Sequence, residues 1–264
     1  MNPRSRSVEV AGVSCRVWEK GDGATVGFLP GLRGLPRWTP FLEALSARHR
    51  VVVPSFPGWP GAGPGHRVLD DTADWVAAAL DLLEASGLDG EALVGESLGA
   101  MLAAEVAALS RATVARLVLI SPMGLFDADA PVRNPFAVFQ PDVATVLATD
   151  AAAYDRVFGV GALQGDALTE HELALFRVDE AAARLFWPFG DRGLAKRLHR
   201  IVQPTQVLTG DADALVPPVY GDRFAAAVSG PVERSVIADA GHLASIDRPD
   251  EVAAAVARFL ADAA

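Results

Sequence analysis

The chain has 264 residues, 51% of them hydrophobic and 21% charged, and its 23 Lys and Arg against 33 Asp and Glu give a net charge of −10. This composition excludes disordered, collagen-like and low-complexity chains. The acidic balance argues against nucleic acid or anionic membranes as partners, because phosphate groups are bound by clustered positive charge.

The chain shows no membrane-spanning or secretory pattern. No run of about 18 apolar residues is present, so we expect no membrane span. The first residues lack the apolar stretch of a signal peptide. Cys15 is the only cysteine, which excludes an internal disulfide and fits a reducing cytoplasm.

The first half of the chain predicts an edge hairpin and then alternating strands and helices. Alternating apolar and polar residues over 8–18 predict the hairpin. A helix is expected to begin at Pro40 with Thr39 as its N-cap, and a later helix to end at Gly87. Short apolar runs predict buried strands, and helical spacing of apolar residues predicts the later helices; the strands are 25–29, 51–53, 92–94 and 116–120, and the helices 69–83 and 98–109.

The same alternation returns near the C-terminus, with strands at 205–209 and 232–237 and helices at 217–228 and 249–261. Short apolar strands separated by amphipathic helices are typical of an α/β fold, with a mostly parallel sheet covered by helices on both faces.

Residues 122–203 interrupt this alternation. They contain helical patterns, no convincing strand and 9 of the 19 aromatic residues. A connection of this length is too long for a simple loop. We therefore expect a core of residues 1–121 and 204–264, and a helical cap of residues 122–203 over the carboxyl ends of the strands, where open α/β sheets bind ligands.

A serine with small neighbours follows the strand at 92–94. Gly95-Glu96-Ser97-Leu98-Gly99 matches G-x-S-x-G and lies between a strand and a helix. In this setting a sharp turn exposes the serine as a nucleophile, and the close approach of strand and helix requires glycine at both ends. The alternative is a glycine-bracketed helix start with a surface serine.

Ser97 needs a base, because a serine hydroxyl is a poor nucleophile at neutral pH. Of the five histidines, only His242 follows the nucleophile in a loop that directly follows a strand, in Asp239-Ala240-Gly241-His242. We predict that His242 is the general base.

The base needs a carboxylate to orient it. The loop after the strand at 205–209 offers Asp213 and Asp211, and Asp127 and Asp129 follow the strand at 116–120. Asp213 is the preferred candidate, and the other three remain open. Asp211 is alternatively a turn residue that bonds its own backbone.

The chain order Ser, Asp, His in this alternating layout resembles the α/β-hydrolase family. The resemblance covers nearly the whole chain and includes Gly210-Asp211-Ala212-Asp213, in which the family's acid is the fourth residue, and Ala240-Gly241-His242. It implies an oxyanion hole made by the backbone N–H groups of Leu98 and Leu32. Pro30 stands where the family usually has histidine, so the hydrogen bonds that shape that loop must differ.

These features predict a serine hydrolase, similar to carboxylesterases, that cleaves an ester of a small or medium apolar molecule without a metal or organic cofactor. Phe139 and Trp187 in the cap are candidate substrate contacts. Cleavage of a carbon–carbon bond of ring-cleavage products, acyl transfer to another acceptor, and a ligand receptor without catalysis are the alternatives.

Overall fold

The computed structural model describes residues 2–139 and 142–261. Its strands form one eight-stranded sheet in the order β1-β2-β4-β3-β5-β6-β7-β8. The pairs β1/β2 and β2/β4 are antiparallel, and all later neighbours are parallel. This confirms the predicted mostly parallel sheet. The strands are β1 Arg4–Val10, β2 Val13–Lys20, β3 Thr25–Leu29, β4 Arg50–Pro54, β5 Glu91–Glu96, β6 Val114–Ile120, β7 Thr205–Gly210 and β8 Val232–Ile237.

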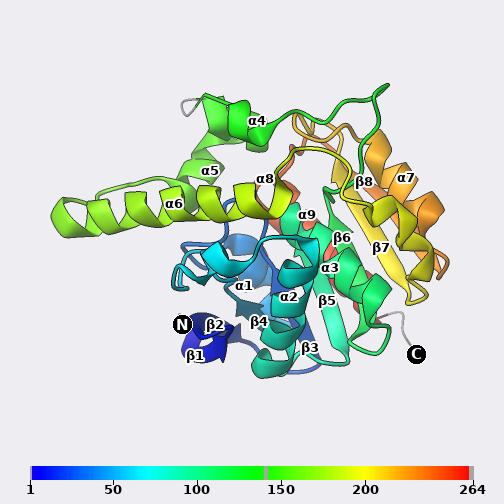
Figure 1. Cartoon of the computed structure of the whole chain (residues 1–264), viewed down its shortest axis with the longest axis horizontal. Helices are drawn as coiled ribbons and strands as arrows, with labels where there is room; N and C mark the ends of the chain where they lie inside the picture. Colours follow the sequence, from blue (N-terminus) through cyan, green and yellow to red (C-terminus); the bar gives the residue numbers. More distant parts are fainter. Residues whose placement is uncertain (1, 140–141, 262–264) are drawn as a thin grey trace.

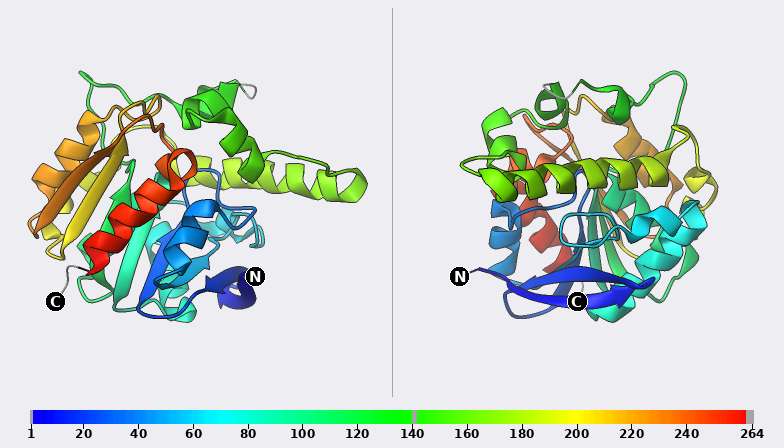
Figure 2. Two further views of the ribbon diagram at one scale, coloured as in Figure 1. Left: turned by 180° about the vertical axis from the view of Figure 1, so that it is seen from behind. Right: turned by 60° about the vertical axis from the view of Figure 1, so that its left-hand side comes forward.

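Helices cover both faces of this sheet (Figures 1 and 2). Helices α1 and α9 lie on one face, and α2, α3 and α7 lie on the other. The bounds are α1 Pro40–Ser46, α2 Thr72–Ser86, α3 Leu98–Leu109, α4 Val143–Leu147, α5 Ala151–Phe158, α6 Gly165–Phe186, α7 Val219–Ala227, α8 Ala244–Asp247 and α9 Pro249–Ala261, with short 3₁₀ turns at Gly65–Val68, Pro135–Ala137, Leu194–Lys196 and Leu198–Arg200.

Local capping explains where the early helices begin and end. The Thr39 hydroxyl accepts a hydrogen bond from the Leu42 N–H at 3.3 Å, so α1 begins at Pro40 as predicted. Helix α2 begins later than the predicted residue 69, because the Asp71 carboxylate caps it. The helix ends at Gly87, which has a φ of 74°.

The centre of the core is formed by β5 and α3. Strand β5 pairs with β3 on one side and β6 on the other, and every residue of α3 except Leu109 is buried. Because neither face of these central strands meets water, their sequences are apolar runs instead of alternating patterns. The chain turns from β5 into α3 at the edge of the sheet where the parallel strands end.

Residues 122–203 are here called the helical insertion, and its helices α4, α5 and α6 lie over this edge (Figure 1). The described part of the insertion contains helices and turns and no strand. Ion pairs hold the C-terminal half of α6 to core loops; they are Arg33–Asp179 at 2.6 Å, Arg67–Glu180 at 3.0 Å and Arg184–Asp70 at 2.8 Å.

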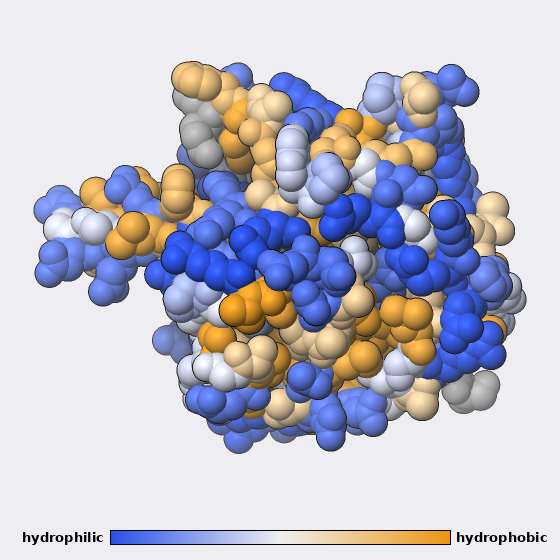
Figure 3. All heavy atoms as spheres, in the orientation of Figure 1, coloured by the Kyte–Doolittle hydropathy of each residue, from blue (hydrophilic) through white to orange (hydrophobic). Residues whose placement is uncertain are grey.

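The N-terminal half of α6 projects beyond the body of the molecule in Figures 1 and 2. It carries hydrophobic as well as charged side chains on its surface (Figure 3), with Leu173 and Phe176 largely exposed. Within the described residues, no helix is long and apolar enough to cross a membrane.

Candidate active site

Ser97 occupies the turn between β5 and α3 and has a strained backbone. Its φ of 58° and ψ of −119° lie outside the regions that non-glycine residues normally adopt. A Cβ atom added at Gly95 would lie 2.5 Å from the Gly99 carbonyl oxygen, and one at Gly99 would collide with the Leu29 carbonyl oxygen. The close approach of strand and helix therefore leaves no space for side chains at these two positions.

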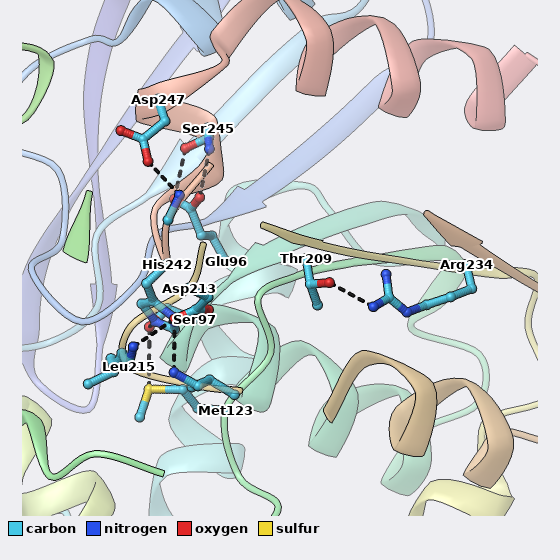
Figure 4. Close-up of polar contacts among 12 residues, drawn as sticks. Glu96, Ser97, Met123, Thr209, Asp213, Leu215, Arg234, His242, Ser245 and Asp247 are labelled. Carbon is cyan, nitrogen blue, oxygen red and sulfur yellow. Dashed lines mark hydrogen bonds and ion pairs between the residues drawn. The ribbon is translucent and has the colours of Figure 1, made fainter. Parts of the chain in front are cut away.

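Three side chains from separate loops form a continuous hydrogen-bonded chain (Figure 4). The distance from Ser97 Oγ to His242 Nε2 is 2.7 Å, and that from His242 Nδ1 to Asp213 Oδ2 is 2.8 Å. Ser97 and His242 are both 0% exposed. This is the arrangement in which an imidazole takes a proton from a serine while a carboxylate stabilises the resulting cation.

The second oxygen of Asp213 is held by the backbone. Oδ1 accepts hydrogen bonds from the N–H groups of Leu215 at 2.9 Å and Val216 at 2.8 Å. Together with the bond to His242, these contacts fix the plane of the buried carboxylate.

The other predicted acids lie away from this chain of contacts. Asp211 is exposed at the start of the same loop. Asp127 forms an ion pair with Arg223, and Asp129 is exposed next to it. The structure therefore brings Asp213, and not these three residues, to His242.

The two residues predicted to form the oxyanion hole, Leu98 and Leu32, lie in segments next to the nucleophile. Leu98 is the first residue of α3, so its N–H has no partner within the helix. Leu32 lies in the loop after β3, next to Gly31, where an added Cβ would lie 2.7 Å from Ser97 Cβ. This close approach brings the Leu32 loop against the serine.

The loop around Leu32 is shaped by Trp59, which our sequence reasoning missed. The buried Trp59 indole donates a hydrogen bond to the Gly31 carbonyl at 3.0 Å, and the Gly34 N–H donates to the same oxygen at 2.9 Å. These bonds occur in a loop where Pro30 replaces the usual histidine. A tryptophan within the Pro- and Gly-rich stretch 54–65 was the available sequence signal.

Glu96 is a second residue whose role the sequence did not reveal. Its carboxylate is buried, and burial raises its pKa from 4.5 to about 7, although hydrogen bonds from Ser245 act in the opposite direction. A buried carboxylate is costly unless its oxygens are hydrogen-bonded. Its place directly before the serine of the G-x-S-x-G motif was the only signal in the sequence.

Two small cavities lie between Leu32 and the helical insertion. The larger has a volume of about 120 Å³ and extends to Arg33 and Asp179. The smaller reaches Leu215, two residues after Asp213. The side chains that line both are Leu32, Pro135, Val138 and Val143.

The two predicted substrate contacts do not line these cavities. Phe139 is 74% exposed and Trp187 is 57% exposed. Trp187 instead borders an open surface hollow beside Arg184 and Glu180. Among the described residues, no group of three or more His, Cys, Asp or Glu side chains is arranged to hold a metal ion.

Comparison with known proteins identifies the family. A model of the alpha/beta hydrolase family matches residues 28–255, which is most of the chain. The chain belongs to the α/β-hydrolase family. This confirms the resemblance and the fold that the sequence predicted.

Relatives within the α/β-hydrolase family differ in activity. The chain is 28% identical over 265 residues to the dihydrolipoyllysine-residue acetyltransferase component of the acetoin cleaving system of Cupriavidus necator, covering 96% of this chain and 68% of that protein. It is 26% identical over 262 residues to 2-hydroxy-6-oxo-2,4-heptadienoate hydrolase of Pseudomonas putida, covering 92% and 91%. The crystal structure of an esterase from Rhodococcus sp. ECU1013 has a TM-score of 0.75 and 19% identity, with both chains fully covered.

Proposed function

We propose that this α/β-hydrolase is a serine hydrolase that cleaves a carboxylic ester of a small or medium apolar molecule through an acyl-enzyme intermediate. The observation that carries the proposal is the unbroken hydrogen-bonded chain from Ser97 through His242 to Asp213. The only cysteine is a poor alternative nucleophile, because burial raises the pKa of Cys15 to about 11.

The proposed reaction has two steps. In the first, Ser97 Oγ attacks the ester carbonyl while His242 Nε2 takes the hydroxyl proton and then delivers it to the departing alcohol. In the second, His242 takes a proton from water, the hydroxide attacks the acyl-enzyme, and the proton returns to Ser97 as the acid leaves. Asp213 holds His242 in the required tautomer throughout both steps.

The N–H groups of Leu32 and Leu98 are proposed to stabilise the oxyanion in both steps. The Leu98 group also lies at the N-terminus of the 12-residue helix α3, where the helix dipole favours negative charge. Because the surroundings of Ser97 are buried, these donors act in a poorly screened environment, where they are worth more than in water.

The small volume of the cavities beside Leu32 favours a substrate with a small acyl group. A volume of about 120 Å³ is well below that of typical ligand pockets, at roughly 300–1,000 Å³. The lining residues come from the Leu32 loop and from the helical insertion. We therefore propose that the insertion acts as a cap on the core formed by residues 1–121 and 204–264, and that it must move for substrate to reach the fully buried Ser97.

Cleavage of a carbon–carbon bond is the second candidate, because the Pseudomonas putida relative is a hydrolase of 2-hydroxy-6-oxo-2,4-heptadienoate and is covered over 91% of its length. Acyl transfer to an acceptor other than water is the third, since the relative from Cupriavidus necator is an acetyltransferase component. All three reactions can use the same three side chains.

A fluorophosphonate probe with mass mapping tests the proposed nucleophile, and a panel of p-nitrophenyl esters tests the reaction. Labelling of Ser97 together with steady turnover of short-chain esters is the expected result. If Ser97 is labelled, esters are not turned over and a 2-hydroxy-6-oxo-dienoate is cleaved, the function is carbon–carbon cleavage and not ester hydrolysis. If the chain is neither labelled nor active on either class of substrate, the proposed function is wrong and the non-catalytic receptor is favoured.

A further inference from the structure

Glu96 is a buried carboxylate that the proposed reaction does not use. It ends strand β5 directly before Ser97 and is 4% exposed. Both of its oxygens are occupied by one residue: Oε2 accepts a hydrogen bond from Ser245 Oγ at 2.8 Å, and Oε1 accepts one from the Ser245 N–H at 3.1 Å.

These bonds connect the strand of the nucleophile to the loop of the base. Ser245 lies three residues after His242 in the short helix α8, and Figure 4 shows it next to Glu96. The contact between Ser97 and His242 loses and regains its proton in every turnover. The contact between Glu96 and Ser245 involves no reacting atom, so it can hold the two loops together while the proton moves.

Asp247 fixes the same loop from its other side. Its Oδ2 accepts hydrogen bonds from the N–H groups of Gly241 at 2.7 Å and Thr149 at 3.0 Å, and its Oδ1 accepts one from Asp150 at 2.9 Å. Through these hydrogen bonds, Asp247 connects the residue before His242 to the junction of α4 and α5. Glu96 provides the matching attachment to the core.

Other titratable groups lie close to Glu96. The titratable groups around Glu96 are His242 and, on α8, Asp247; Asp213 contacts the far side of the imidazole. Glu96 itself titrates near pH 7, because burial raises its pKa to about 7, so its hydrogen bonding to Ser245 can be followed through the pH range of the reaction.

We propose that Glu96 is a positioning residue for His242: through its hydrogen bonds to Ser245, Glu96 holds the histidine loop against the nucleophile. This inference rests on the proposed function, since it assumes that His242 acts as the base for Ser97.

The test measures the rate at which a fluorophosphonate probe labels Ser97, from about pH 5 to pH 9, because this rate depends on the base and not on the unknown substrate. In Glu96→Gln, one acceptor oxygen and the charge are lost. We expect labelling to slow at least tenfold, since a displacement of about 1 Å at a reacting group costs ~10²-fold. Glu96→Gln also lacks the carboxyl group that titrates near pH 7, so its profile should lack any step in rate that this group produces in the wild type.

Two further variants complete the experiment. Ser245→Ala keeps the titrating carboxyl group of Glu96 and removes one hydrogen bond, so we expect a smaller loss, of roughly three- to tenfold, with any step in rate from Glu96 retained. Glu91→Gln, at the opposite end of β5, is the matched control and should label like the wild type. Ser245→Ala also decides the outcome if Glu96→Gln fails to fold.

Equal labelling rates and pH profiles for the wild type, Glu96→Gln and Ser245→Ala would overturn this inference and leave the proposed function intact. A loss of thermal stability in Glu96→Gln with an unchanged labelling profile would also overturn it, since the role of Glu96 would then be structural alone. A wild-type chain that the probe does not label at Ser97 would overturn both.

Discussion

Gly31 lies directly against Ser97. A Cβ atom placed on Gly31 would lie 2.7 Å from Ser97 Cβ and 3.4 Å from Ser97 Oγ. Real Cβ atoms almost never approach so closely, so the loop that carries the Leu32 N–H can reach the nucleophile only because residue 31 has no side chain. The glycine and the serine follow different strands, β3 and β5, which are neighbours in the sheet.

Gly31→Ala should therefore displace the Leu32 N–H from the proposed oxyanion hole. We expect kcat to fall by about 10²–10³-fold, as for the loss of one oxyanion donor, with a smaller change in KM. Ester turnover and circular dichroism measure activity and fold. Gly190→Ala, where an added Cβ would meet no atom within 4 Å, is the control. Wild-type kcat in Gly31→Ala would remove Leu32 from the mechanism.

Ser97→Ala should lower turnover by several orders of magnitude with the fold unchanged, because residues of a catalytic triad act as a unit. Steady-state kinetics and circular dichroism measure the two properties. Since the hydrogen-bond partners of the fully buried hydroxyl among the described residues are His242 and the Met123 sulfur, its removal disturbs little else. Near-wild-type activity would show that the proposed mechanism is wrong.

Asp213→Asn should reduce kcat by up to ~10⁴-fold, because an amide favours the wrong tautomer of His242. Asp211→Asn is the matched control, since this residue begins the same loop with an exposed side chain, and it should have far less effect. Measured kcat values for the two variants decide between them. The reverse order would identify Asp211 as the acid, and two mild effects would point to Asp127 or Asp129.

Glu96 should make the stability of the protein depend on pH. Its folded pKa of about 7 lies above the ordinary value of 4.5, so between these values the folded state holds a proton that the unfolded state has released. The free energy of unfolding therefore decreases as pH rises from about 4.5 to 7, by at most about 3 kcal/mol. Glu96→Gln lacks this contribution, so its Tm relative to wild type should be higher at pH 8 than at pH 5. A pH-independent difference in Tm would contradict the burial of a titrating carboxylate.

Val143→Ala should shift acyl-chain preference towards longer chains. Val143 borders both cavities beside Leu32, and each methylene accommodated in an apolar pocket is worth ~1–3 kcal/mol. The change should affect KM more than kcat, as measured on a series of p-nitrophenyl esters. Phe139→Ala, whose side chain is largely exposed, should leave the profile unchanged. If Phe139→Ala changed the profile and Val143→Ala did not, Phe139 would line the pocket. The insertion would then have to close over the core in a different arrangement.

The sequence by itself determined the local elements and the nucleophile motif. Buried strands are recognisable as short apolar runs, and Thr39 and Gly87 marked helix ends because capping depends on the nearest few residues. Gly95 and Gly99 identified the turn at Ser97 for the same reason. A side chain at either position would collide with the backbone of that turn or of the neighbouring strand.

Only the tertiary structure decided which distant residues meet. The sequence offered four aspartates as partners for His242, and the packing of the loops after β7 and β8 selected Asp213. Glu96 meets Ser245 across 149 positions of sequence, and Trp59 reaches Gly31 from another loop, so neither contact leaves a local pattern. The exposure of Phe139 was unpredictable for a related reason: composition shows that the insertion is aromatic, but helix packing determines which rings turn inward.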